Sequence, residues 1–179
     1  MSGQGKGTIA LVTGANRGIG FETARQLGQQ GMHVLMGARN EAKGKEAEGK
    51  LKGEGLDVEF ILLDVDDPKT HAKAAKSIEE KFGKLDVLVN NAGILIDEKN
   101  NGSFVSTSKT PMDLLRKTFE TNFFNVVALT QTLLPLVKKS SAGRIVFLSS
   151  GLGSLTMHSD PNLRFTITSR WLTTFRRRR

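Results

Sequence analysis

Short apolar runs alternate along the chain with longer segments whose apolar positions follow a helical period. The apolar or β-branched runs predict five strands, at about residues 8–13, 33–38, 58–63, 85–90 and 143–149. The segments between them predict helices at about 18–30, 40–53, 68–82 and 112–138. Strands joined by helical crossovers predict an α/β fold with a doubly wound parallel sheet between two layers of helices.

A glycine-rich turn joins the first predicted strand to the first helix, and its sequence is Thr13-Gly14-Ala15-Asn16-Arg17-Gly18-Ile19-Gly20. Gly14 permits a tight turn, Gly18 lets the backbone approach a pyrophosphate, and Gly20 lets the helix pack closely. The helix N-terminus then presents N–H groups and the positive end of its dipole to an anion. The turn predicts a dinucleotide site. Its Gly-x-x-x-Gly-x-Gly spacing differs from the commoner Gly-x-Gly-x-x-Gly, and an ordinary strand-to-helix turn is the alternative.

A second motif, Asn90-Asn91-Ala92-Gly93, directly follows the fourth predicted strand. Together with the glycine turn, Asp64-Val65, Asn122 and Ser149-Ser150, in this order and at these separations, it resembles the short-chain dehydrogenase/reductase family over about residues 8–162. Within the family, the sequences of residues 11–22 and 82–93 are most similar to those of the monomeric carbonyl-reductase branch. The resemblance implies a Rossmann-like sheet in the order 3-2-1-4-5, with the cofactor at the carboxyl ends of the strands.

The resemblance also implies which residues bind the cofactor. Asp64 would contact the adenine edge, Val65 would supply a backbone contact, and the second motif would line the ribose side. A strand-ending turn is the alternative for that motif. The full set of expected cofactor residues is Gly14, Asn16, Arg17, Gly18, Ile19, Gly20, Arg39, Asp64, Val65, Asn91, Ala92 and Gly93.

The end of the second predicted strand indicates which cofactor is preferred. NAD enzymes usually place an acid there to hold the ribose 2′-hydroxyl. This chain places Arg39 there, a planar cation suited to bidentate contact with a 2′-phosphate, and Arg17 can approach the same group. The alternative is that both arginines are ordinary surface charges. Because both fall where NADP-preferring relatives carry basic residues, we expect NADP(H) rather than NAD(H).

The chemistry that the resemblance implies is hydride transfer to the carbonyl of a small molecule, with a tyrosine donating the proton. By resemblance, Ser150 would hold the substrate oxygen and Asn122 would support a water relay. The Tyr-x-x-x-Lys that completes this set is absent, because the chain contains no tyrosine and no lysine after Lys139. We therefore expect an NADP-dependent oxidoreductase by family, with impaired or no catalysis in these 179 residues. The alternative is a catalytically dead NADP(H)-binding remnant.

The sequence changes character after about residue 162. Residues 163–179 contain six arginines and no acid, glycine or alanine. We therefore divide the chain into a partial dinucleotide-binding domain, residues 1–162, and a basic tail, residues 163–179. One hypothesis is a reading-frame slip, because one permitted set of codons for the tail, read two bases later, encodes a Tyr-x-x-x-Lys. A divergent tail and a deliberately shortened chain are the alternatives.

An incomplete C-terminal side has a structural consequence. Without a further strand, the fifth strand leaves an open sheet edge beside uncovered apolar positions, and such an edge favours self-association. The apolar residues of the tail offer partial cover for this surface.

Charge and composition exclude several other functions. The net charge is +8, and removing the six tail arginines leaves +2 for residues 1–162, which show no basic face with interleaved aromatics. We therefore expect no specific nucleic-acid partner, although an interaction protein that uses its arginine tail remains an alternative. The lack of cysteine excludes a disulfide scaffold, and the three scattered histidines predict no metal site. A polar N-terminus and the lack of a long apolar segment predict no membrane span and a cytoplasmic protein.

Overall fold

The computed structural model describes residues 7–94, 110–151, 154 and 156. The chain forms two compact units, which are Met1–Ile94 with Phe119–Leu148, and Leu95–Thr118 with Ser149–Arg179. The first unit contains the whole sheet. Of the second, the structure describes mainly helix α4 (Met112–Phe119), whose last residue belongs to the first unit. The domain boundary expected at residue 162 and the basic tail lie outside the described residues and stay predictions.

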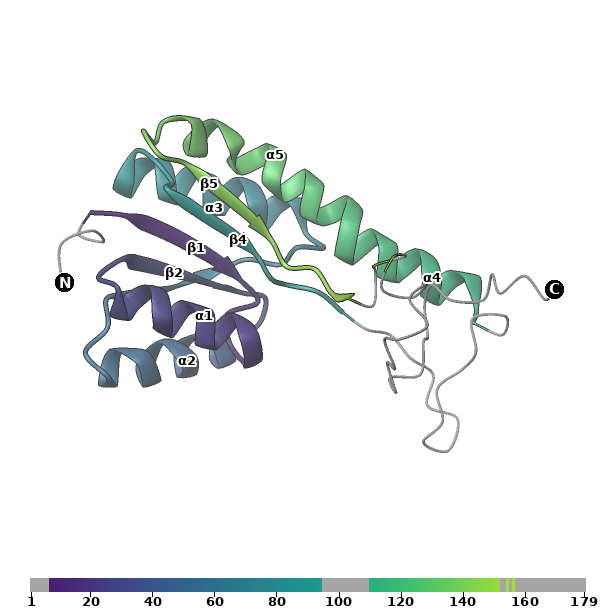
Figure 1. Ribbon diagram of the computed structural model, residues 1–179, viewed down its shortest axis with the longest axis horizontal. Helices are drawn as coiled ribbons and strands as arrows, with labels where there is room; N and C mark the ends of the chain where they lie inside the picture. Colours follow the sequence, from purple (N-terminus) through teal and green to yellow (C-terminus); the bar gives the residue numbers. More distant parts are fainter. Residues whose placement is uncertain (1–6, 95–109, 152–153, 155, 157–179) are drawn as a thin grey trace. The chain divides into compact units, whose positions relative to one another are not determined.

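The first unit is built on a five-stranded parallel sheet in the order β3-β2-β1-β4-β5 (Figure 1). This confirms the doubly wound fold and the strand order that the resemblance implied. The strands are β1 (Ile9–Thr13), β2 (His33–Ala38), β3 (Val58–Leu62), β4 (Val87–Asn90) and β5 (Arg144–Phe147). Helices cover both faces, and they are α1 (Gly18–Gln29), α2 (Glu41–Gly53), α3 (Pro68–Phe82) and α5 (Asn125–Lys138).

Alternation along the strands divides the core into two layers. Ala10 and Val12 of β1 belong to an apolar cluster with Ala24 of α1 and Leu51 of α2. The intervening Ile9 and Leu11 face the other way, into a cluster with Ile78 of α3 and Leu129 and Leu133 of α5. Figure 1 shows the same division, with α1 and α2 on one face of the sheet and α3 and α5 on the other. A buried parallel sheet requires apolar residues on both faces, so its strands read as continuous apolar runs.

Helix starts follow the sequence signals. Asp67 caps α3 by accepting a hydrogen bond from the backbone N–H of Lys69 at 3.0 Å, and Pro68 occupies the first turn, where no N–H is needed. Asn40 caps α2 in the same way through the N–H of Lys43, at 2.9 Å. The boundaries expected for these helices are confirmed to within a residue.

The long helix expected over 112–138 is not uniform. A π-helical turn, η2 (Glu120–Phe124), separates α4 from α5. Such turns insert an extra residue into the helical repeat and rotate the side chains that follow. Apolar periodicity does not reveal this interruption, because the helix on either side continues with the same pattern. The turn carries Thr121 and Asn122, and both side chains bond to loops at the ends of strands.

Among the helices that the structure describes, none has the length and apolarity needed to cross a bilayer. The cytoplasmic location expected from the sequence stays a prediction.

Candidate functional site

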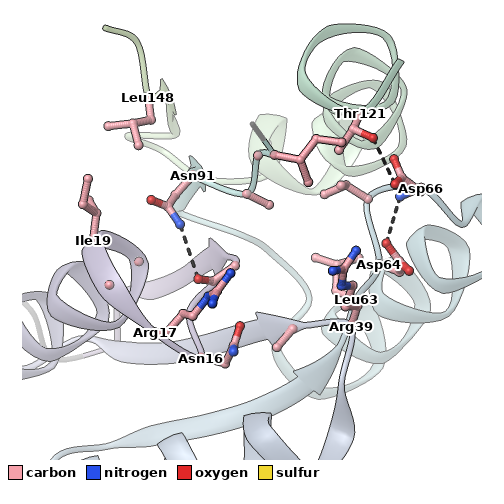
Figure 2. Close-up of a pocket in the computed structure, with 18 residues that line it drawn as sticks. Asn16, Arg17, Ile19, Arg39, Leu63, Asp64, Asp66, Asn91, Thr121 and Leu148 are labelled. Atoms are coloured by element: carbon pink, nitrogen blue, oxygen red, sulfur yellow. Dashed lines mark hydrogen bonds between the residues drawn. The ribbon is translucent and has the colours of Figure 1, made fainter. Parts of the chain in front are cut away.

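A pocket of about 400 Å³ lies at the carboxyl ends of the central strands and is lined by 18 residues (Figure 2). Every cofactor residue expected from the sequence lies in its lining. These are Gly14, Asn16, Arg17, Gly18, Ile19, Gly20, Arg39, Asp64, Val65, Asn91, Ala92 and Gly93. The rest of the lining was not predicted from the sequence and consists of Ala38, Leu63, Asp66, Ile94, Thr121 and Leu148.

The glycine turn has the backbone that its sequence predicts. Gly14 and Gly18 have φ angles of 67° and 60°, in the left-handed region that favours glycine. A Cβ on Gly14 would lie 3.0 Å from the Cα of Ala92, so this glycine allows two strand ends to approach. A Cβ on Gly18 would meet nothing within 4 Å, so this glycine borders open space where α1 begins. The N-terminus of α1 therefore offers free space to an anion.

The third glycine allows the close packing that the sequence predicts. A Cβ on Gly20 would collide with the side chain of Asn91 and the carbonyl of Gly14. The close approach that Gly20 allows is therefore between α1, the glycine turn and the end of β4. It brings the second sequence motif against the first.

Thr13 links the ends of β1 and β4, a role that was not predicted from the sequence. Its buried hydroxyl accepts hydrogen bonds from the backbone N–H groups of Asn91 at 3.0 Å and Ala92 at 2.9 Å. The Asn91 side-chain amide also donates to the Thr13 carbonyl at 2.8 Å. These bonds hold the Asn-Ala-Gly segment beside the glycine turn. The only sequence signal for this link is that a threonine directly precedes the first glycine of the turn.

Two exposed arginines enter the pocket from neighbouring loops (Figure 2). Arg17 lies in the glycine turn, and Arg39 follows the last residue of β2. The turn is held to β2 by a hydrogen bond from the N–H of Ala15 to the carbonyl of Gly37, at 3.0 Å. A smaller adjoining cavity of about 300 Å³ shares Arg17 and adds Lys43 of α2 to its lining. This side of the pocket is therefore basic.

The segment after β3 forms the opposite wall. The hydroxyl of Thr70 accepts from the N–H of Asp64 at 3.0 Å and donates to the Asp64 carbonyl at 2.9 Å. Nε2 of the buried His71 lies 3.1 Å from the carbonyl oxygens of both Asp64 and Val65, so this nitrogen carries the proton. Both side chains come from the first turn of α3. They hold the backbone that presents Asp64 and Val65 to the pocket.

Asp66 connects this wall to the π-helical turn. Its carboxylate accepts from the hydroxyl of Thr121 at 3.0 Å and from the side-chain amide of Asn125 at 2.9 Å. Its own N–H donates to Oδ1 of Asp64 at 3.1 Å. Figure 2 shows Asp66 between Thr121 and Asp64, with both bonds drawn. The sequence carried a weak signal for this role, namely polar residues next to the motif positions.

The two expected catalytic residues lie in different parts of the structure. The Asn122 side chain accepts from the N–H of Ile94 at 2.8 Å and donates to the Ile94 carbonyl at 2.7 Å, so both ends of its amide are engaged. The water relay expected of Asn122 stays a prediction. Ser150 follows β5 by three residues, belongs to the second compact unit and does not line the pocket. Its expected contact with a substrate also stays a prediction.

Within the part of the chain that the structure describes, no three His, Cys, Asp or Glu side chains gather where they could hold a metal ion. The donors that line the pocket are instead backbone N–H groups, amides and guanidinium groups. This set suits phosphate and nucleotide recognition better than metal binding.

Comparisons with known proteins agree with this geometry. The profile for short chain dehydrogenases matches residues 8–161. Short-chain dehydrogenase anuI of Penicillium roqueforti is 38% identical over 162 residues, which cover 88% of this chain and 62% of that protein. Carbonyl reductase (NADPH) 3 of Mus musculus is 40% identical over 144 residues, which cover 79% of this chain and 48% of that protein.

Solved structures show the same relationship. Salutaridine reductase from Papaver somniferum matches with a TM-score of 0.74 at 35% identity, over 84% of this chain and 60% of that one. The chain thus spans about half to three-fifths of the length of these relatives.

Proposed function

Because the chain belongs to the short-chain dehydrogenase family, we propose that it binds NADP(H) in the pocket at the carboxyl ends of β1 to β4. The observation that carries this proposal is the convergence of the glycine turn, the end of β2, the segment after β3 and the end of β4 on one pocket. These four segments are widely separated along the chain. An ordinary strand-to-helix turn would not require the other three to meet it.

The residues present fit each part of the proposed cofactor. The open space at Gly18 and the N-terminus of α1 suit the pyrophosphate. Arg39 and Arg17 suit a 2′-phosphate, because guanidinium groups form strong charge-assisted bonds with phosphate oxygens. Asp64 and Val65 suit the adenine, and Asn91 to Gly93 suit the nicotinamide ribose. The name of the mouse relative also specifies NADPH.

We further propose that the chain is the cofactor-binding part of a carbonyl reductase. When bound, the reduced cofactor supplies a hydride to the carbon of a carbonyl group. Ser150 would hold the carbonyl oxygen, while Asn122 holds the backbone of Ile94, which lines the pocket. These 179 residues contain no phenol to donate the proton that the reaction needs, so carbonyl reduction by this chain would be slow or absent. A binding protein without catalysis is the second candidate, and the lack of tyrosine favours it.

Self-association through the edge of the sheet is also proposed. In the described residues, β5 pairs with β4 and leaves its other edge open. Its side chains Val146 and Phe147 are 46% and 54% exposed, and no proline or acid interrupts the edge. Antiparallel pairing of two copies of β5 would satisfy the open backbone groups.

Cofactor preference tests the main proposal. We expect NADPH to bind more tightly than NADH by about tenfold or more, since each hydrogen bond between charged groups contributes about 1.5–3 kcal/mol. The change Arg39→Ala should remove most of that preference and leave NADH affinity almost unchanged. Arg144→Ala is the matched control, because Arg144 starts β5 at the opposite end of the strands. Fluorescence titration at low salt measures the affinity of all three proteins for both cofactors, and equal binding of the two cofactors by the unmodified chain would contradict the proposal.

A further inference from the structure

The carboxylate of Asp66 is bound by two side chains of the helix on the far side of its loop. Thr121 donates to Oδ2 at 3.0 Å and Asn125 donates to Oδ1 at 2.9 Å, although they lie 55 and 59 residues away in sequence. Thr121 is only 3% exposed, whereas Asp66 is exposed. The bond to the exposed Asp66 therefore comes from a buried hydroxyl, that of Thr121. Both oxygens of Asp66 are committed to protein contacts, although this residue lines the pocket.

The bonds around the loop fall into two groups with different effects. Thr70 and His71 bond the N–H of Asp64 and the carbonyls of Asp64 and Val65, so they hold the backbone. The Asp66 N–H instead reaches Oδ1 of the Asp64 side chain, at 3.1 Å. That bond exists only while Asp66 keeps its place, and Thr121 and Asn125 hold Asp66 there.

We infer that Thr121 is a positioning residue for the adenine end of the pocket and acts through Asp66 on the carboxylate of Asp64. The π-helical turn makes this possible, because it directs Thr121 to the segment after β3 while the next residue, Asn122, bonds Ile94 after β4. One helical turn therefore sets both walls of the pocket. The inference deepens the proposed function, since it assumes that the adenine of the cofactor lies against Asp64.

The physical reason is preorganisation of a flexible acceptor. A partly exposed aspartate such as Asp64 samples several rotamers, and a ligand that needs one of them must overcome the entropy of the others. With one oxygen of Asp64 bonded to the Asp66 N–H, the carboxylate is oriented before the ligand arrives. Loss of the Thr121 hydroxyl releases one of the two anchors of Asp66. The expected cost is that of about one hydrogen bond, or about a fivefold loss of affinity.

The experiment uses Thr121→Val, which removes the hydroxyl and keeps the branched shape, and Thr121→Ser, which restores it. Thr132→Val is the matched control, because Thr132 lies on α5, the helix that directly follows the π-helical turn, and its hydroxyl donates to the carbonyl of Ala128 within α5. The probe is adenosine 2′,5′-bisphosphate, titrated calorimetrically against the full chain. We expect an affinity loss of about fivefold for Thr121→Val, recovery for Thr121→Ser and no change for Thr132→Val.

Two further measurements separate positioning from a general loss of stability. In an Asp64→Ala background, Thr121→Val should cause no additional loss of affinity, because the residue through which it acts is gone. In the chain without ligand, amide hydrogen exchange at Asp66 should accelerate in Thr121→Val, while exchange in β1 stays unchanged.

An additive loss in the Asp64→Ala background, or unchanged affinity in Thr121→Val, would overturn the positioning role while leaving the proposed function intact. Failure of the unmodified chain to bind adenosine 2′,5′-bisphosphate would overturn the proposed function itself, and the inference with it.

Discussion

The two edge strands of the sheet, β3 and β5, differ in the charge and exposure of their side chains. On the β3 edge, the ring of Phe60 packs against Gly44 of α2 and the exposed flank carries Glu59, which pairs with Lys81. On the β5 edge, Ile145 joins the core, but Val146 and Phe147 are about half exposed on opposite faces. A charged side chain on an edge discourages pairing with another sheet. β3 therefore has the character of a true edge. Apart from Arg144 at its start, β5 presents apolar side chains and has no further strand beside it among the described residues.

The comparison extends to the helices beside each edge. The faces of α1 and α2 toward the sheet are buried, whereas Phe119, Phe123 and Phe124 around the π-helical turn are each more than half exposed. The pocket is lined mainly by segments that follow β1 to β4, together with Thr121 of the π-helical turn and Leu148 after β5, and all of these residues belong to one compact unit. From this contrast we expect cofactor binding and substrate turnover to be separable in this chain.

The largest effect expected from this separation concerns catalysis. We expect NADPH oxidation with aldehydes, ketones and quinones to be at most a trace, because a positioned general acid contributes about 10²–10⁴-fold in rate and the chain has no tyrosine to supply it. The activity is compared with that of a second chain, which carries the Tyr-x-x-x-Lys segment encoded in the other reading frame, Tyr-Asn-Val-Ser-Lys, and its continuation. If the 179-residue chain turned over as fast as the second chain, catalysis would not depend on the missing tyrosine, and another proton donor would have to be found.

Cofactor binding should depend on Gly18. We expect Gly18→Val to abolish NADP(H) binding, because a β-branched side chain at a φ of 60° is strained and would fill the space before α1. The body of the fold should remain, since Gly18 is exposed. Circular dichroism and cofactor titration on one sample test both parts. Gly49→Val is the control for an exposed helical glycine whose Cβ meets nothing within 4 Å. Retained binding in Gly18→Val would show that the glycine segment is only a strand-to-helix turn and does not bind the cofactor.

The carboxylate of Asp86 joins the start of β1 to the segment that follows α5. It accepts from the N–H of Ile9 at 2.8 Å, from the hydroxyl of Ser140 at 2.5 Å and from Lys84 at 2.9 Å. Burial raises the pKa of Asp86, but the hydrogen bonds from Ser140 and Ile9 and the charge of Lys84 together hold that pKa below its ordinary value. The charged form is therefore favoured in the folded state.

The sign of the pH effect follows from that lowered pKa. The contribution of Asp86 to the free energy of unfolding is complete above the unfolded pKa of about 4, and is lost as the pH falls through the lower folded pKa. We expect Asp86→Asn to lower the free energy of unfolding by about 1–3 kcal/mol at pH 7. The same change should flatten the acid side of the stability profile. Urea denaturation at several pH values measures both, and an unchanged acid profile would assign the acid sensitivity to other groups.

The smallest effect concerns the open edge of β5. We expect Val146→Lys to shift the chain from self-associated species toward the monomer with little change in stability, because a lysine on an open edge opposes pairing and Val146 is already about half exposed. Light scattering over a range of concentrations measures the mass. The control is Lys73→Ala, on α3 away from this edge. A monomeric unmodified chain would contradict self-association through β5.

Much of the site could be predicted from the sequence because its signals are local. The glycine turn requires a positive φ at Gly14 and Gly18, and only glycine adopts it readily, so the requirement is visible in the residue type. Arg39 is readable for the same reason, since it directly follows a strand that apolar periodicity locates. The parts that were missed, Thr13, Asp66 and Thr121, are ordinary polar residues in ordinary positions. Their importance depends on partners 55 to 79 residues away.

The sequence by itself determined the order of strands and helices, the turn that faces the phosphate, and the absence of a phenol. Each depends on periodicity, backbone preference or composition, which are properties of neighbouring residues. Tertiary structure decided which side chains hold the pocket walls and which apolar residues stay uncovered. The π-helical turn and the link from Thr121 through Asp66 to Asp64 arise only when α5 packs beside the segment after β3. The reason is physical, because a hydrogen bond between distant segments depends on the packing of whole helices against a sheet.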